Sequence, residues 1–296
     1  MEIRPAQMGD AESALVLHDL VAPFLATTGS GLRRRLSGPA DGPGYGVFAA
    51  VDGEQVIGWT STGLISGSDP VDGQLRLIVH PEHRGRGVGT ALLETAHERL
   101  KEGGAVTARV FADPASVGWA SQWGYRETRR VHYASMAPSD APELPPVPEG
   151  LRLSPVNELD PRRLYEADEI AQQTKPGDAK ITSRPYEQWL AAIWDSPAMV
   201  LDLSTALVDT DGRVVGFTLG NGDHEKIWSQ MTATLPEFRG RGFAKLVKCA
   251  TLHRAAAAGV TGMYTANYDG NSPMIAVNQW LGYTRTATHT VLICPL

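Results

Sequence analysis

The chain has 296 residues, of which 42% are hydrophobic, and its formal net charge is -6. This length is sufficient for two domains of about 150 residues each. The acidic balance argues against nucleic-acid binding, which usually requires a basic face. The two cysteines, Cys249 and Cys294, form no CxxC pair, so the sequence indicates neither a disulfide framework nor a metal site.

Targeting and membrane signals are not evident in the sequence. Residues 1–10 contain no apolar signal core, and no segment approaches the ~20 apolar residues that span a bilayer. We therefore expect a cytoplasmic protein, a monomer or homodimer, that binds neither membranes nor nucleic acid.

The first half of the chain predicts alternating strands and helices. A strand at residues 2–5 precedes a helical pattern, and a hairpin at 47–59 turns at Asp52-Gly53. An apolar strand before Pro81 then leads through a glycine-rich turn into a helix. The half ends with Trp123-Gly-Tyr125 and a final strand.

A proline-rich segment, residues 138–150, separates this half from a second one with the same order of elements. Its five prolines cannot supply the backbone donors of a helix or central strand, so it predicts an extended linker. Beyond it come a strand at 151–155, a helix at 163–171 and a hairpin at 206–217. A second glycine-rich turn and Leu281-Gly-Tyr283 follow.

The spacing of matching features indicates an internal duplication. Gly58 and Gly216, the two loop arginines, and Gly124 and Gly282 are separated by 158, 155 and 158 residues. We predict domains at 1–137 and 151–296, joined by the linker at 138–150. Each is expected to be an α/β domain with a mixed, mostly antiparallel sheet flanked by helices.

Both glycine-rich turns have the composition of an anion-binding loop. The first runs from Arg84 to Gly89 as Arg-Gly-Arg-Gly-Val-Gly, and the second from Arg239 to Ala244 as Arg-Gly-Arg-Gly-Phe-Ala. Glycines allow the backbone to approach a ligand closely, and the N–H groups at a helix start attract anions. Arginines at the rim add positive charge. A pyrophosphate fits this arrangement.

The loops resemble the [Gln/Arg]-x-x-Gly-x-[Gly/Ala] signature of the GCN5-related N-acetyltransferases (GNAT), preceded in both halves by that family's Pro-Glu. The resemblance covers nearly the whole chain and implies acetyl-CoA as co-substrate, bound in a splay between two parallel strands. It assigns coenzyme contacts to Leu77, Ile78, Val79, Arg84, Gly85, Arg86, Gly87, Val88, Gly89 and Thr90 in the first half, and to Thr232, Ala233, Thr234, Arg239, Gly240, Arg241, Gly242, Phe243, Ala244 and Lys245 in the second.

Two asparagines near the last helix are further candidates for coenzyme contact. Asn271, before Ser-Pro, predicts a helix N-cap, and family members often use an asparagine here to touch the coenzyme. Asn267 lies four residues earlier. The first half has Asp113 at the matching place, where a negative charge would disfavour a phosphate-bearing ligand.

The family's usual catalytic side chains are missing. Its tyrosine, four residues before the glycine of the Gly-Tyr motif, is replaced by Ala120 and Asn278. The strand positions at which many members have a glutamate hold Gln74 and Arg76 in the first half and Ser229 and Gln230 in the second. An amine must lose its proton and a thiolate must gain one, so an acid and a base help. The remaining candidates are Glu225, acting through water, and Tyr268.

The leading functional prediction is transfer of an acetyl group from acetyl-CoA to a primary amine of a small molecule by direct attack. Two alternatives stay open, an acyl-CoA-binding pseudo-enzyme used for sensing or scaffolding, and a protein or peptide N-acetyltransferase. The tandem arrangement is similar to that of mycothiol synthases, in which the second domain is catalytic. The pair Asn267 and Asn271 favours the second half here as well.

Overall fold

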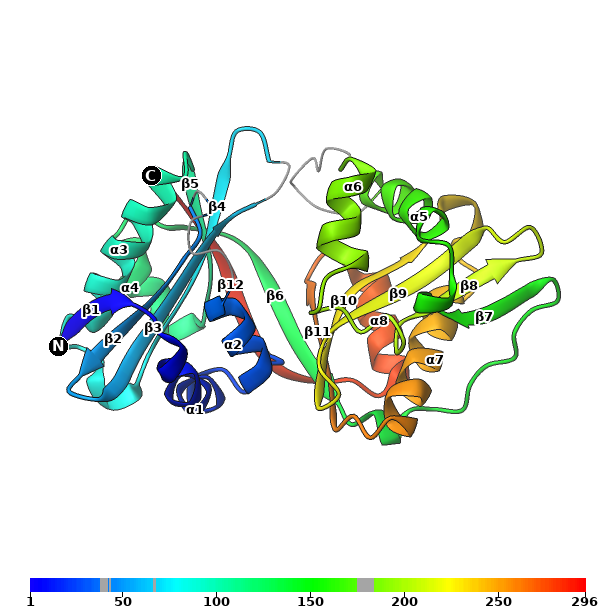
Figure 1. Cartoon of the computed structure of the whole chain (residues 1–296), viewed down its shortest axis with the longest axis horizontal. Helices are drawn as coiled ribbons and strands as arrows, with labels where there is room; N and C mark the ends of the chain where they lie inside the picture. Colours follow the sequence, from blue (N-terminus) through cyan, green and yellow to red (C-terminus); the bar gives the residue numbers. More distant parts are fainter. Residues whose placement is uncertain (38–41, 43, 66–67, 175–183) are drawn as a thin grey trace. The chain divides into compact units, whose positions relative to one another are not determined.

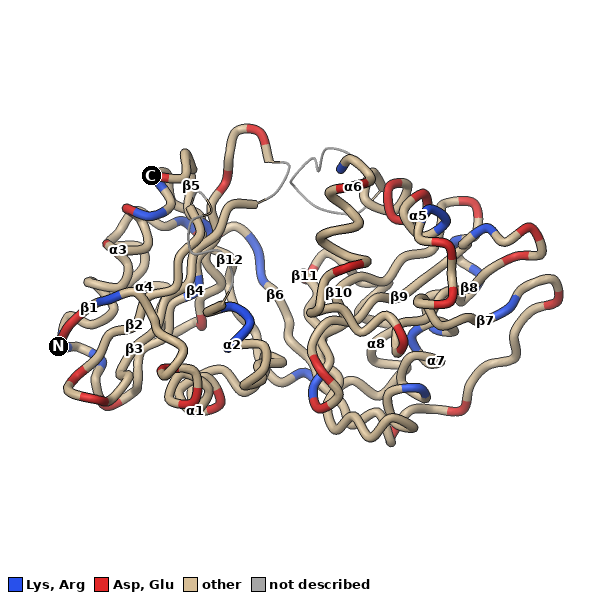
Figure 2. The backbone as a smooth tube through the Cα atoms, viewed as in Figure 1, with Lys and Arg blue, Asp and Glu red and all other residues tan. Residues whose placement is uncertain are grey.

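A computed structural model describes residues 1–37, 42, 44–65, 68–174 and 184–296. The chain forms two compact units: unit 1 holds residues 1–131 and 288–296, and unit 2 holds residues 132–287. Each contains strands and helices in the order that the sequence predicts (Figure 1). Acidic and basic residues are interspersed along both units (Figure 2).

Unit 1 is built on a sheet with the strand order β1-β2-β3-β4-β5-β12-β6. The turn at Asp52-Gly53 connects β2 to β3, as predicted. Its elements are β1 (Glu2–Pro5), α1 (Ala11–Val21), α2 (Gly29–Ser37), β2 (Gly46–Asp52), β3 (Gln55–Leu64), β4 (Asp72–Val79), α3 (Val88–Glu102), β5 (Thr107–Ala112), α4 (Val117–Ser121), the first part of β6 (Arg126–Met136) and the second part of β12 (Thr284–Pro295).

Unit 2 repeats this plan with the order β6-β11-β10-β9-β8-β7. The predicted hairpin is present as β8 and β9. Its elements are β7 (Leu151–Pro155), α5 (Pro161–Gln173), α6 (Tyr186–Trp189), β8 (Thr205–Asp209), β9 (Val214–Gly222), β10 (Lys226–Thr234), α7 (Phe243–Ala257), β11 (Gly262–Tyr268) and α8 (Ser272–Leu281), with residues 132–136 of β6 and 284–287 of β12.

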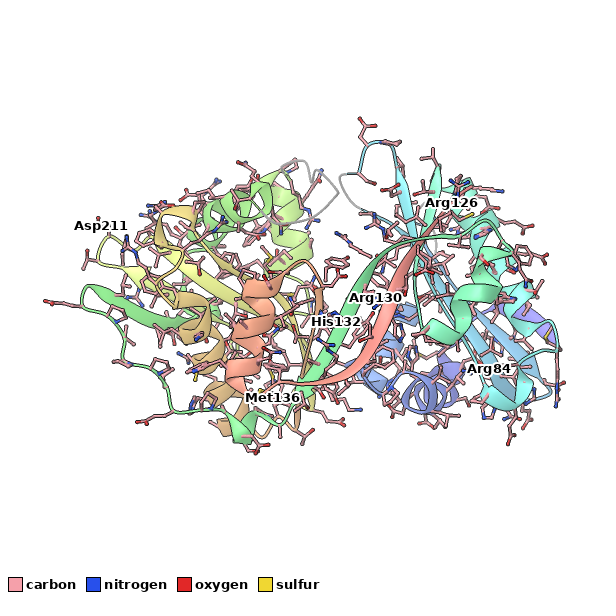
Figure 3. The ribbon with its side chains drawn as sticks, turned by 180° about the vertical axis from the view of Figure 1, so that it is seen from behind. Arg84, Arg126, Arg130, His132, Met136 and Asp211 are labelled. Atoms are coloured by element: carbon pink, nitrogen blue, oxygen red, sulfur yellow. The ribbon has the colours of Figure 1, made fainter. Side chains whose placement is uncertain are left out.

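The compact units do not follow the boundaries of the sequence repeat. The last residues of the chain belong to unit 1, where Thr290–Pro295 of β12 pair antiparallel with Ala112–Thr107 of β5. Strand β6 likewise passes from unit 1 into unit 2; Figure 3 labels Arg126, Arg130, His132 and Met136 in order along it. The predicted boundaries at 137 and 151 divide the repeat in sequence, whereas β12 pairs with β5, a strand some 180 residues earlier in the chain. Local sequence patterns do not reveal such a long-range pairing.

Helices cover both faces of each sheet. In unit 1, α1 and α2 pack on one face around Trp59 and Ile78, and α3 and α4 pack on the other around Leu75 and Leu292. In unit 2, α5 and α6 cover one face, and α7 and α8 cover the other. The predicted α/β fold class, with a mixed and mostly antiparallel sheet, is therefore confirmed.

The proline-rich segment contains a short 3-10 turn, Pro138–Asp140, followed by residues in neither helix nor strand. It packs on α7: the carbonyl oxygen of Pro142 accepts from the Cys249 thiol at 3.3 Å and lies 2.9 Å from His253 Nε2. Both cysteines are buried free thiols. No helix among the described residues is both long and apolar enough to cross a membrane.

Candidate active site

The two glycine-rich loops adopt the same backbone conformation. Each follows a 3-10 turn that begins with the predicted proline, Pro81 or Pro236, and each ends at a left-handed glycine that caps the next helix. The φ angles are +72° and +83° at Gly85 and Gly87. The second-loop equivalents, Gly240 and Gly242, have +78° and +81°. Side-chain-bearing residues rarely adopt these angles, so glycine is required at all four positions.

The surface over each loop is open. A Cβ atom built on any of the four left-handed glycines would have no atom of a described residue within 4 Å. The first backbone N–H groups of α3 and α7 have no partner within their helices and point out of the helix start. Both loops therefore have the geometry of an anion site at a helix N-terminus.

The first arginine of each loop has a structural contact. Arg84 Nε donates to the carbonyl oxygen of Val79 at 3.3 Å, and Arg239 Nε donates to that of Thr234 at 3.2 Å (Arg84 is labelled in Figure 3). These bonds tie the loop to the last residue of the preceding strand. The second arginines, Arg86 and Arg241, are exposed.

Each loop follows a strand that diverges from its parallel neighbour. β4 pairs with β5 only from Asp72 to Gln74 and then continues five residues further, to Val79. β10 pairs with β11 only from Lys226 to Trp228 and continues to Thr234. The gap that opens between the strands is the splay expected from the family resemblance.

The two splays differ in backbone geometry. β10 has a register shift between Ser229 and Met231 against β9, so Gln230 is an extra residue in the strand. β4 pairs with β3 without interruption from Gly73 to Val79. A bulge removes backbone groups from the ladder and re-aims the chain, and such features cluster at binding sites. Only β10, of these two strands, shows one.

The residues around the two splays differ in polarity. At equivalent positions of the repeat, unit 1 has Leu77, Val79, Leu93 and Ala120, whereas unit 2 has Thr232, Thr234, Lys248 and Asn278. Thr232 Oγ1 is 2.8 Å from Thr218 Oγ1. The buried hydroxyl oxygen of Thr234 has no hydrogen-bond partner among the described residues. Unit 2 therefore has polar side chains around the splay at positions where unit 1 has hydrocarbon.

An indole also lies beside the first turn of α3 in unit 1. A Cβ on Gly89, in the first turn of α3, would lie 3.6 Å from the Trp119 ring of α4. The Trp119 and Trp123 rings are 6.4 Å apart. The position equivalent to Trp119 in unit 2 is Val277, a smaller side chain.

The two asparagine candidates of unit 2 differ in their contacts. Asn267, on β11, accepts from Asn278 Nδ2 at 2.6 Å, and the Asn278 amide oxygen is buried without a partner among the described residues. Asn271 is the N-cap residue of α8, as predicted, but its side chain makes no cap hydrogen bond and so is available to a ligand. In unit 1, Asp113 accepts from Ala115 N and Ser116 N, so its carboxylate is used as a cap.

The two catalytic candidates lie at opposite ends of β11. Glu225 is exposed in the turn before β10, and its backbone carbonyl accepts from Thr261, which precedes β11. Tyr268 is the half-buried last residue of β11, and its carbonyl accepts from Asn271 N. The structure does not bring the two side chains into one cluster, and their catalytic role stays a prediction.

Sequence reasoning missed a buried lysine. Lys248, in the second turn of α7, is 3% exposed, and its Nζ donates to Ser229 Oγ on β10 at 2.9 Å. It also lies 5.1 Å from the centre of the Tyr283 ring. Burial lowers the pKa of Lys248 to about 7 and raises that of Tyr283. The contrast with Leu93 at the equivalent position was the sequence signal that could have revealed it.

The remaining predicted contacts fall on the loops and the first helical turns. Lys245, in the first turn of α7, lies 4.9 Å from the centre of the exposed Trp280 ring, and Arg241 lies 5.5 Å from that of Phe238. Within the described part of the chain, no group of three or more His, Cys, Asp or Glu is placed to hold a metal ion.

The chain matches two acetyltransferase family models. The Acetyltransferase (GNAT) family model matches residues 17–125, and the Acetyltransferase (GNAT) domain model matches residues 155–266. Together they cover more than half of the chain. The chain is a tandem acetyltransferase of the GNAT family.

Relatives in sequence match this chain over most of their length. A mycothiol acetyltransferase of Nocardia farcinica is 29% identical over 295 residues, which cover 95% of this chain and 94% of the relative. One from Nocardioides sp. is 26% identical over 254 residues, covering 80% and 84% of the two chains.

Solved structures show the same fold. A GCN5-related N-acetyltransferase from Sphaerobacter thermophilus superposes with a TM-score of 0.79 at 21% identity, covering 99% of this chain and 95% of the other. A tandem GNAT protein from the clavulanic acid biosynthesis pathway has a TM-score of 0.74 at 20% identity, with coverage of 99% and 98%. At these identities the likeness concerns the fold.

Proposed function

We propose that this GNAT protein transfers the acetyl group of acetyl-CoA to a primary amine of a small molecule, and that the reaction takes place in the cleft of unit 2. The observation that carries the second point is the bulged splay between β10 and β11, with polar side chains around it. The equivalent splay of unit 1 is unbulged and has hydrocarbon at the matching positions, and Trp119 lies beside the first turn of its helix.

The loop and the strand would hold the two ends of the coenzyme. The N–H groups after Gly240 and Gly242 would bind the pyrophosphate, with Arg241 adding positive charge. The pantetheine would pair with the open edge of β10, along Thr232, Ala233 and Thr234, and the amide of Asn271 is available beside it. An amide-rich arm suits an edge of unpaired backbone groups.

The chemistry follows from this placement. A neutral amine attacks the thioester carbonyl carbon, and the oxygen becomes an oxyanion. A backbone N–H released by the bulge at Gln230 would donate to that oxyanion, and one preorganised donor is worth roughly 3–4 kcal/mol. Cleavage of the C–S bond then leaves the amide and a coenzyme thiolate.

The names of the relatives suggest the first acceptor to assay. Several are called mycothiol acetyltransferase, so desacetylated mycothiol belongs at the head of an amine panel that also includes amino sugars, amino acids and short peptides. Peptide acceptance would favour the alternative of a peptide N-acetyltransferase.

A matched pair of charge reversals tests which unit works. Arg86 and Arg241 are equivalent exposed loop residues, so Arg241→Glu and Arg86→Glu make the same change in the two units. We expect Arg241→Glu to raise the Kd for acetyl-CoA about 10-fold or more, consistent with a lost charged hydrogen bond, and Arg86→Glu to leave it unchanged. Calorimetry gives the Kd, and a thiol-release assay gives the rate.

Three results would count against the proposal. The opposite pattern of the two variants would assign the reaction to unit 1. Coenzyme binding without thiol release for any amine would favour the acyl-CoA-binding pseudo-enzyme. Failure of the wild-type protein to bind acetyl-CoA would exclude both.

A further inference from the structure

The lysine of α7 reaches the cleft of unit 2 only through a serine. Lys248 is buried, so its ammonium cannot contact a ligand directly. Its Nζ donates to Ser229, which is half-buried and accepts at 2.9 Å. Among the described residues, the Ser229 hydroxyl finds no acceptor for its own proton. The serine therefore has a proton to donate into the cleft while it accepts one from the lysine.

Ser229 lies at the point where the two strands separate. Trp228 is the last residue of β10 that pairs with β11, and Ser229 follows it, immediately before the bulged Gln230. A pantetheine arm has about as many main-chain bonds as four extended residues, which span about 14 Å. Measured along β10 from its end at Thr234, about 14 Å reaches Gln230, the neighbour of Ser229.

No carboxylate of a described residue pairs with Lys248. Leu207 of β8 and Val215 of β9 pack with Leu246 and Val247 of the same helix. The Tyr283 ring, next to the start of β12, contacts Lys248 itself. Tyr283 is the titratable group that faces the ammonium, and burial keeps its phenol neutral by raising its pKa. Burial alone lowers the pKa of Lys248 to about 7, below the ~8.5 of an ordinary thiol.

We propose that Lys248 is a positioning residue that delivers a proton through Ser229 to the thiolate that leaves when the acyl thioester is cleaved. This inference rests on the proposed function. It assigns the acid role, vacant because Asn278 replaces the family's tyrosine, to a group on a different helix.

The relay conserves protons and electron pairs. The amine nitrogen forms the C–N bond, and the C–S bond breaks with its electron pair remaining on sulfur. The Ser229 hydroxyl gives its proton to the thiolate and takes one from the Lys248 ammonium, which becomes a neutral amine. The proton lost by the acceptor nitrogen passes to water, and water returns one to Lys248 through the Ser229 hydroxyl. The products are the amide and the coenzyme thiol.

Three substitutions separate the relay from a packing role. Lys248→Met keeps the length of the side chain without its proton, Lys248→Arg keeps a charge that cannot be given up, and Ser229→Ala breaks the connection. Thr251→Val is the matched control, because Thr251 is a buried hydroxyl one turn further along α7 that donates to Thr205 at 2.8 Å. The assay is thiol release from acetyl-CoA with an accepted amine.

We expect Lys248→Met and Ser229→Ala to lower kcat about 100-fold, in the range of general acid catalysis, while the Kd for acetyl-CoA changes less than about 3-fold. The wild-type rate should fall as pH rises through about 7, because the relay needs the ammonium. Because a proton moves in the relay, the wild-type kcat should also be lower in D₂O than in H₂O. Both this solvent isotope effect and the fall in rate above pH 7 should disappear in Lys248→Met and Lys248→Arg but persist in Thr251→Val.

The possible outcomes distinguish failure of the relay from failure of the proposed acetyltransferase function. A wild-type pH profile and isotope effect in Lys248→Met would overturn the relay and leave the acetyltransferase intact. Equal losses in Lys248→Met and Thr251→Val would assign Lys248 a packing role and also overturn the relay. No thiol release by the wild-type protein with any amine would contradict the proposed function itself.

Discussion

Replacement of Lys248 by methionine should stabilise the protein at low pH and remove part of its pH dependence. The pKa of this lysine falls from an ordinary value of 10.5 to about 7 on folding because the ammonium is desolvated. One pKa unit corresponds to about 1.4 kcal/mol, so the folded state with a charged Lys248 is destabilised by about 5 kcal/mol relative to an exposed lysine.

The sign follows from proton counting. Between pH 7 and 10.5 the unfolded chain holds a proton on this lysine that the folded chain has released, so unfolding takes up a proton. The free energy of unfolding should therefore rise with pH across that window, by about 1.4 kcal/mol per pH unit, and the full destabilisation should be present below pH 7. Methionine, of similar length, cannot titrate and packs well on an aromatic ring.

Denaturant unfolding at pH 6 to 10, with and without Lys248→Met, measures this contribution. Relief of the desolvation should contribute about 5 kcal/mol at pH 6, and loss of the bond to Ser229 should cost about 1 kcal/mol at every pH. The net stability advantage of the variant should therefore be about 4 kcal/mol at pH 6 and shrink steadily above pH 7. Thr251→Val should shift stability by the same amount at every pH. A difference between Lys248→Met and wild type that does not vary with pH would refute the desolvation argument.

Three further substitutions test individual contacts. Trp119→Ala should lower the free energy of unfolding by about 2 kcal/mol because the ring is half-buried. It also removes the ring beside Gly89, so the number of coenzyme molecules bound per chain in calorimetry should rise from one towards two. Burial raises the pKa of Asp168, so the free energy of unfolding of the wild-type protein should fall as pH rises from about 4 through the folded pKa. Asp168→Asn keeps an acceptor for Trp189 but cannot titrate, so denaturant titrations of this variant should not show the fall. Asp10→Ala should lower the free energy of unfolding by about 2–3 kcal/mol at pH 7, because it removes the two 2.8 Å hydrogen bonds from Arg4. These bonds hold the pKa of Asp10 low, so in thermal melts the loss should vanish at a pH below that lowered pKa.

The parts of the fold that the sequence predicted correctly are governed by local rules. Asp52-Gly53 produced the expected hairpin turn because glycine tolerates a positive φ, here +60° at Gly53. The glycines of both loops were identified for the same reason. The destination of β12 was not predictable in this way, because pairing of Thr290 with Ala112 joins residues far apart in the chain.

The candidate site was predictable where it depends on the loop and not where it depends on packing. Helix α7 is buried on nearly all sides, so no apolar stripe marked Lys248 as an inward-facing charge. The bulge at Gln230 leaves no composition signal, since its neighbours Ser229 and Met231 are ordinary strand residues. Trp119 had the appearance of a routine aromatic residue, because only the folded chain places its ring against Gly89.

The two units show that the pyrophosphate loop and the reaction chemistry are separable. Both loops hold the same conformation, yet the side chains further along the strand and helix differ at every compared position, as Leu93 and Lys248 illustrate. In unit 2 the position of the family's acid is filled by Asn278, an amide bonded to Asn267 that has no proton to give at neutral pH. A thiolate leaving this cleft therefore needs its proton from another group, and the Lys248–Ser229 pair is placed where the strands separate.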